Sequence, residues 1–201
     1  MKLNWAERWA VNNRSRVIQQ KWEIRWFRKK SDLPAGLSLL EIGCGRGAGA
    51  RIIHRTFQPR TLQASDLDLE MIRKAEDYLS LEDRRLIRFL TADILNLPYG
   101  NASFDAVFGF GVLHHVPDWQ SALGEISRVL KPGGTYFLEE LYPGLYQNFI
   151  TKHILLHPRE NRFRSRDLKM ALRERNLEIR HCLEIKMAGV LGIAVKAHCQ
   201  K

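Results

Sequence analysis

The sequence predicts an α/β fold in which a doubly wound, mostly parallel β-sheet is covered by helices on both faces. From residue 38 onward, short apolar segments alternate with helical segments, and a glycine-rich turn follows the first apolar segment. Strands that alternate with helices require right-handed crossover connections, which produce parallel strands. Residues 177–198 differ, because two apolar segments are separated there by a tight turn, which favours an antiparallel closing hairpin.

The expected elements follow from these patterns. Residues 1–30 are predicted to be helical, and the proline and glycine within residues 31–36 end that segment. Five strands and their helices follow in the order strand 38–42, helix 48–57, strand 61–66, helix 69–79, strand 86–90, strand 104–109, helix 119–130 and strand 134–139. The chain then closes with helix 165–175, strand 177–186, a turn at 187–189 and strand 190–198.

Length and composition fit a single domain over residues 1–201. With 45% hydrophobic residues, the chain can bury a substantial core without disulfides or metals. The longest apolar run, residues 107–116, is broken by glycines and histidines and is shorter than the roughly 18 residues that span a bilayer. The first residues lack a continuous apolar stretch, so no secretory signal is expected and a cytoplasmic location is predicted. Three cysteines far apart in sequence, Cys44, Cys182 and Cys199, are expected to be free thiols.

A glycine-rich turn joins the first strand to its helix. Gly43, Gly45 and Gly47 alternate there behind Glu41, at the edge where open α/β sheets bind nucleotides. Glycines allow a tight turn and a close approach of a ligand to the backbone. Asp66, about 20 residues further on at the end of the second strand, is suited to accept hydrogen bonds from ribose hydroxyls. These residues alone also fit a dinucleotide fingerprint, so NAD(P) is an alternative ligand at this stage.

Further segments decide between these ligands. Five of them occur in order over residues 38–140: EIGCGRG at 41–47, TADILNLP at 91–98, SFDAV at 103–107, LHHVPD at 113–118 and RVLKPGG at 128–134. Together they resemble class I S-adenosylmethionine-dependent methyltransferases, within them the ubiquinone/menaquinone-biosynthesis-like branch, methyltransferase type 11. The resemblance implies a Rossmann-like, seven-stranded sheet and S-adenosylmethionine as cofactor. It divides the chain into an N-terminal helical lid (1–36), a cofactor-binding core (37–140) and a part (141–201) that holds a partial lid, the last helix and the closing strands.

The resemblance also implies a set of cofactor contacts. The glycines would line the methionine and ribose portion, Asp66 the ribose, and Asp93 with Ile94 the adenine, while Glu41 would brace the loop or the aminocarboxyl end. The full set is Glu41, Gly43, Gly45, Gly47, Asp66, Leu67, Asp93, Ile94 and Gly109. Two residues depart from the family pattern: Arg46 would add a cation near the carboxylate, and Ser65 replaces a hydrophobic residue before Asp66.

The implied reaction is an in-line displacement at a sulfonium methyl group, for which positioning supplies much of the rate. A general base is needed only when the acceptor arrives protonated. The candidates at the strand ends are His114, His115 and Glu139, and spacing alone assigns the role to none of them. Glu139 and Glu140 are expected to point to opposite faces of the strand. No metal site is expected.

The positive net charge of the chain indicates anionic partners. The net charge is +10 and the isoelectric point is near 9.8. The favoured acceptor is a small molecule of lipophilic or anionic character, and RNA or protein is the alternative acceptor. An NAD(P)-linked oxidoreductase and a catalytically silent cofactor-binding module are alternatives of other classes. The acceptor, the methylated atom and the oligomeric state are not determined by the sequence.

The N-terminal segment concentrates this charge. Residues 1–30 hold nine basic residues and two acids, Glu7 and Glu23, together with four tryptophans at 5, 9, 22 and 26. Such a segment can cover the active site as a lid, which is the interpretation favoured here. The other interpretation is a peripheral contact with an anionic membrane, because basic helices with tryptophans lie at such surfaces.

Overall fold

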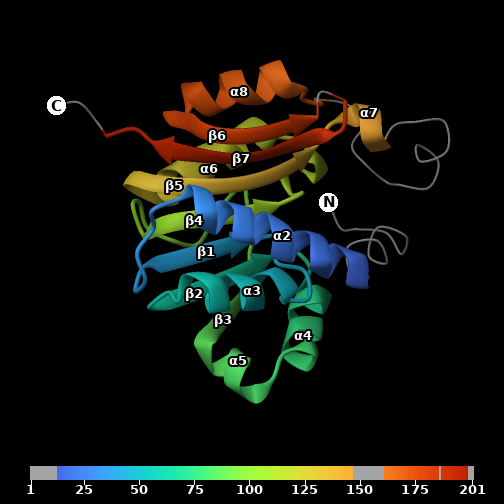
Figure 1. Ribbon diagram of the computed structural model, residues 1–201, viewed down its shortest axis with the longest axis vertical. Helices are drawn as coiled ribbons and strands as arrows, with labels where there is room; N and C mark the ends of the chain where they lie inside the picture. The colour runs from blue at the N-terminus through green and yellow to red at the C-terminus, as the bar shows by residue number, and fades with distance from the viewer. Residues whose placement is uncertain (1–12, 147–160, 186, 199–201) are drawn as a thin grey trace.

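A computed structural model describes residues 13–146, 161–185 and 187–198 of the chain (Figure 1). Its strands are β1 (Ser38–Ile42), β2 (Thr61–Asp66), β3 (Ile87–Thr91), β4 (Phe104–Phe110), β5 (Leu130–Leu141), β6 (Leu177–Ile185) and β7 (Gly189–Lys196). They form one seven-stranded sheet in the order β3-β2-β1-β4-β5-β7-β6. The predicted α/β class and the seven-stranded sheet are confirmed.

The sheet is mostly parallel, as predicted. Strands β1 to β5 pair in parallel, and β7 runs antiparallel to both β5 and β6. The hairpin folds back so that β7 lies inside the sheet and β6 forms the edge. The strand order reverses at β1, with β2 on one side and β4 on the other, and the carboxyl ends of these strands border a crevice of the kind in which such sheets bind ligands.

Helices cover both faces of the sheet. On one face lie α2 (Arg14–Lys30), α3 (Ala48–Phe57) and α4 (Leu69–Tyr78), and on the other α6 (Trp119–Val129) and α8 (Ser165–Glu174). Three short helices occur in connections: α5 (Leu81–Leu86), η1 (Leu113–His115) and α7 (Pro143–Tyr146). None of the helices in the described ranges is long and apolar enough to cross a bilayer.

Helix α2 is anchored to the sheet by aromatic packing. Phe27 and Ile24 are fully buried, and the Phe27 ring lies 4.9 Å from that of Phe137 on β5 and 6.4 Å from that of Phe108 on β4. Figure 1 shows α2 crossing in front of the sheet beside α3. This anchoring fixes the helix relative to the carboxyl ends of the strands, where its first turns lie.

Two local predictions were wrong. Strand β5 begins at Leu130 and not at the predicted residue 134, because residues 131–134 continue the strand through a register irregularity with Gly133 at φ +76°. Helix α5 was not predicted, since six residues carry too little periodicity; it is nucleated by Ser80, whose hydroxyl accepts a hydrogen bond from the Asp83 amide. Residues 1–12, expected to be helical, residues 147–160, expected to roof the pocket, and Cys199 lie outside the described residues.

Candidate functional site

The glycine turn after β1 adopts a conformation that only glycine takes up easily. Gly43, Gly45 and Gly47 have φ values of +65°, +53° and +77°. A Cβ at Gly43 would lie 2.5 Å from Cγ2 of Val112, whereas a Cβ at Gly45 would meet no atom of the described residues within 4 Å. Gly43 therefore allows close packing against the loop after β4. Gly45 borders open space.

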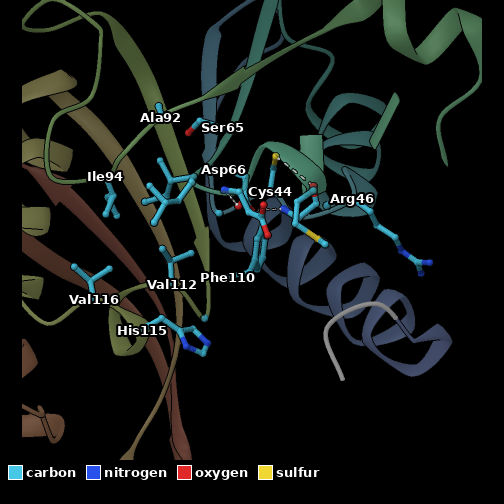
Figure 2. A pocket seen from close by; sticks show the side chains of 18 of the residues that line it. Cys44, Arg46, Ser65, Asp66, Ala92, Ile94, Phe110, Val112, His115 and Val116 are labelled. Carbon is cyan, nitrogen blue, oxygen red and sulfur yellow. Dashed lines mark hydrogen bonds between the residues drawn. The ribbon is translucent and has the colours of Figure 1, made fainter. Parts of the chain in front are cut away.

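Asp66, the last residue of β2, is hydrogen-bonded to this turn. Its Oδ2 accepts a hydrogen bond from the Gly45 amide at 2.9 Å, and its Oδ1 accepts one from the Asp68 amide at 2.9 Å (Figure 2). Burial raises the pKa of Asp66, and these backbone hydrogen bonds oppose that increase. A carboxylate offers about four lone-pair positions, so the backbone amides leave part of its accepting capacity for a ligand.

The glycine turn and the Asp66 carboxylate border one cleft at the carboxyl ends of β1, β2 and β4. The cleft encloses about 1290 Å³ of space, including the part open to solvent. Figure 2 shows Asp66 and Cys44 on one side, with Ile94, Val112 and Val116 across from them. Its walls combine a few polar groups with many apolar side chains, which is typical of small-molecule sites.

Residues 40–138 match a family model described as a methyltransferase domain. They form a class I S-adenosylmethionine-dependent methyltransferase domain. The recognition made from the five sequence segments is confirmed, and S-adenosylmethionine is the cofactor of this family. The resemblance implies that the glycine turn and Asp66 are the part of the domain that binds this cofactor.

Relatives agree with this family. A fatty-acid O-methyltransferase of Mycolicibacterium smegmatis is 39% identical over 106 residues, which cover 51% of this chain and 36% of that protein. A phthiotriol/phenolphthiotriol dimycocerosates methyltransferase of Mycobacterium leprae is 33% identical over 112 residues, covering 54% and 39%. The matched segment thus spans less than two fifths of either relative. A solved S-adenosylmethionine-dependent methyltransferase of Aquifex aeolicus shares the fold, with a TM-score of 0.76, 16% identity and coverage of 98% of this chain and all of that one.

Six of the nine residues expected at the methyltransferase cofactor line the cleft: Gly43, Gly45, Asp66, Leu67, Asp93 and Ile94. The other three lie behind it. A Cβ on Gly47 would contact Phe89 and Ala75, and one on Gly109 would contact the Tyr136 hydroxyl, so these glycines serve packing of the surrounding elements. Asp93 also stabilises its own turn, since its Oδ1 accepts a hydrogen bond from the Leu95 amide at 2.9 Å. Contact of these residues with cofactor stays a prediction.

Glu41 is buried beneath the glycine turn. It is 1% exposed, one carboxylate oxygen accepts a hydrogen bond from the Ala50 amide, and the other, Oε2, has no partner among the described residues. Burial, followed by repulsion from Asp66, raises the pKa of Glu41 to about 8. The carboxyl group is therefore largely protonated at neutral pH and braces the start of α3.

The structure shows the surroundings of Arg46 and Ser65, the two residues that depart from the family pattern. The Arg46 guanidinium lies 4.6 Å from the centre of the Tyr78 ring and extends away from Asp66 (Figure 2). The aromatic ring holds the guanidinium, and Arg46 also lines the cleft. The expected cation near the carboxylate stays a prediction. Ser65 is buried, and its hydroxyl donates a hydrogen bond of 3.4 Å to the Glu41 carbonyl.

The three candidate bases differ in position. His114 is buried, and its Nδ1 lies 2.8 Å from Oε2 of Glu140. Glu139 is paired with Arg16 at 2.8 Å, so it faces α2 while Glu140 faces the opposite side, as predicted. Among the three, His115 lines the cleft (Figure 2).

Glu140 organises the loop after β4, a role that the sequence analysis missed. Its Oε1 accepts hydrogen bonds from the amides of Val112 at 3.1 Å and Leu113 at 2.8 Å, and its Oε2 accepts one from the amide of His114 at 3.3 Å. The carboxylate is fully buried. Because Val112 and His115 line the cleft, Glu140 shapes one wall of the site from within the fold.

Arg16 and Gln20 on α2 were also missed, and both line the cleft. Burial opposes the charge of Arg16, but pairing with Glu139 and Glu23 outweighs it and raises the pKa of this arginine. Burial, then repulsion from Glu139, raises the pKa of Glu23 to about 7. The i, i+4 spacing of Arg16 and Gln20 was visible in the sequence, but Arg16 and Glu139 are 123 residues apart, so their contact was not.

Proposed function

We propose that this chain transfers a methyl group from S-adenosylmethionine to a lipophilic small molecule. The observation that carries the proposal is the open space beside Gly45 facing the Asp66 carboxylate, within a domain of the methyltransferase family. A side chain at Gly45 would fill this space. The chain spans only part of its curated relatives, so the activity is inferred for the domain described here.

Three parts of the cleft would hold the cofactor. The backbone of Gly43 and Gly45 would border the methionine and ribose portion, and the remaining lone pairs of Asp66 would accept the ribose hydroxyls. Ile94 presents an apolar surface for the adenine ring. When bound, S-adenosylmethionine supplies an electrophilic methyl group on a sulfonium sulfur.

The chain's own residues contribute position and exclusion of water. Phe110, Val112 and Val116 give the cleft an apolar wall that suits a hydrocarbon portion of an acceptor. Fixed orientation of two reactants supplies about 7 to 11 kcal/mol in well-ordered systems. His115 is the candidate to accept a proton from an acceptor hydroxyl or phenol.

The named relatives motivate the choice of acceptor class. One is called a fatty-acid O-methyltransferase and another acts, by name, on phthiotriol and phenolphthiotriol dimycocerosates. The apolar wall of the cleft is compatible with acceptors of this kind.

Methyl transfer is tested with radiolabelled S-adenosylmethionine and a panel of acceptors. The panel contains a long-chain fatty acid, a phenolic lipid and a sterol, with RNA and a basic protein as the alternative acceptor classes. We expect label in an organic-extractable product, and much less label with Asp66→Ala at the same subsaturating cofactor concentration. Label that appears only in RNA or protein would replace the proposed acceptor class. Cofactor binding without transfer to any of them would favour a silent binding module.

A further inference from the structure

The outer face of α2 combines exposed cations with exposed apolar side chains. Ile18 and Trp22 are 68% and 56% exposed, an unusual degree for such large apolar residues. Residues spaced three or four apart share a helix face. The exposed residues of this face are Arg14, Ile18, Lys21, Trp22, Arg25 and Lys29.

Within the described part of the chain, the two helices that border this face, α2 and α3, expose no acidic side chain. Within α2 and α3 the acid is Glu23, which is 3% exposed and points to the inner side of the helix. No salt bridge to Lys21 or Arg25 is found among the described residues, although both side chains are exposed. The face therefore presents uncompensated positive charge.

A shallow groove between α2 and α3 extends this charge. It is lined by Lys21 and Arg25 from α2, by Arg51 and Arg55 from α3, and by Ile52 and Thr56. Arg51 is oriented by Tyr78, to whose hydroxyl it donates a hydrogen bond of 2.7 Å. Arg55 lies 3.3 Å from Asp83 and is 66% exposed. Asp83 offsets the charge of Arg55, and Lys21, Arg25 and Arg51 leave the groove with a net positive charge, which favours a ligand with several phosphates or an anionic surface.

We propose that the outer face of α2, with the groove beside it, docks on an anionic lipid surface. Trp22 and Ile18 would enter the interface between headgroups and acyl chains, while Lys21, Arg25, Arg51 and Arg55 would contact lipid phosphates. The aliphatic Ile18 beside the tryptophan favours lipid over nucleic acid, because aliphatic side chains do not stack on bases.

The opposite face of the same helix reaches the methyltransferase cleft. Arg16 and Gln20 line that cleft, and Ile24 and Phe27 hold the helix against the sheet. A helix is about 10 Å wide, so docking would hold the cleft roughly that far from the lipid. This arrangement deepens the proposed function, since a lipophilic acceptor partitions into the bilayer. Docking itself does not depend on methyl transfer.

The test is co-sedimentation of the full chain with vesicles. Vesicles of phosphatidylcholine mixed with phosphatidylglycerol are compared with vesicles of phosphatidylcholine alone, each at low and high salt. We expect binding to the anionic vesicles that weakens with salt. Lys21→Glu/Arg25→Glu should reduce it roughly 10-fold or more, and Trp22→Ala should reduce it at both salt concentrations.

Arg166→Glu/Arg173→Glu is the matched control, because it reverses two exposed cations on α8 on the other face of the sheet. This control should bind as the parent does. Equal loss in both double variants, or no binding of the parent to anionic vesicles, would overturn the proposal. A single-stranded RNA that binds through Lys21 and Arg25 while vesicles do not would assign the face to nucleic acid. Calorimetry with S-adenosylhomocysteine on the same variants tests cofactor binding separately from vesicle binding. The affinity for S-adenosylhomocysteine should not change.

Discussion

The carboxylate of Asp66 and the amide of Gly45 are joined by a hydrogen bond of 2.9 Å, although 21 residues separate them in sequence. The bond links the end of β2 to the turn after β1, which are neighbouring parallel strands. It means that the same carboxylate that would bind the ribose also fixes the conformation of the turn. Loop shape and cofactor affinity are therefore expected to change together.

Substitutions at Gly43 and Gly45 should separate stability from binding. Gly43→Ala places a Cβ 2.5 Å from Val112 at a positive φ, so it should destabilise the fold by about 2 to 4 kcal/mol, from left-handed strain and overpacking. Gly45→Ala meets no protein atom, so it should cost only the strain of about 1 to 2 kcal/mol. It should instead weaken S-adenosylhomocysteine binding by filling ligand space.

Urea unfolding and calorimetry on both glycine variants check this contrast. If Gly45→Ala bound the ligand as tightly as the parent, the open space beside Gly45 would not belong to the cofactor. If Gly43→Ala unfolded at the same urea concentration as the parent, the close approach to Val112 would be wrong.

Glu41 should make stability fall as pH rises. Its pKa is about 8 in the folded protein and near 4.3 in an unfolded chain. The folded state therefore binds more protons between these values, so the contribution is fully present below pH 4 and is lost as pH rises through 8. Glu41→Gln removes the titration. The difference in melting temperature, variant minus parent, should therefore increase steadily from pH 5 to pH 9. A difference that stays constant over this range would contradict the burial of a protonated carboxyl.

Glu140→Ala should loosen the loop after β4. The substitution removes the acceptor of three backbone amides and of the His114 ring. Leaving such donors unpaired in the interior should cost about 2 to 5 kcal/mol of stability, and S-adenosylhomocysteine affinity should fall because Val112 and His115 line the cleft. Glu178→Ala, at an exposed ion pair with Arg180, is the control and should change neither quantity. Unaltered thermal unfolding of Glu140→Ala would refute the role of this carboxylate.

The two adjacent histidines should behave differently. His115→Gln should lower kcat about 100-fold or more with an acceptor that arrives protonated, while the melting temperature stays near that of the parent. His114→Gln should lower the melting temperature, because the ring is buried against Glu140. Full turnover by His115→Gln would show that positioning alone drives transfer to that acceptor.

Most of the fold could be predicted because its signals are local. Helix α3 has the predicted bounds, and the alternation of β1, α3 and β2 requires parallel crossovers whatever lies elsewhere. The continuation of β5 through residues 131–134 could not be predicted, since a Pro-Gly-Gly segment is typical of a turn. Pairing of Leu130 and Thr135 with β4, on either side of the irregularity, keeps the segment within the strand.

Site residues that lie at strand ends were predicted from the sequence. Site residues whose roles depend on contacts between distant segments were missed. Gly45 and Asp66 were found because a strand end places each of them at the crevice. Arg16 and Glu140 were missed, because their roles depend on contacts with Glu139 and with the loop at 112–114 that no spacing encodes. The stacking of Arg46 on Tyr78 was also missed, because it joins the glycine turn to the end of α4.

Calorimetric titration of S-adenosylhomocysteine into the parent chain and into Asp66→Ala tests the cofactor cradle most directly. Asp77→Ala, which removes an exposed carboxylate on α4, is the matched control, and circular dichroism establishes that each variant is folded. The parent and the control should bind, and Asp66→Ala should bind roughly 10-fold more weakly or worse. Folded Asp66→Ala with the affinity of the parent would contradict the assignment of this carboxylate to the cofactor.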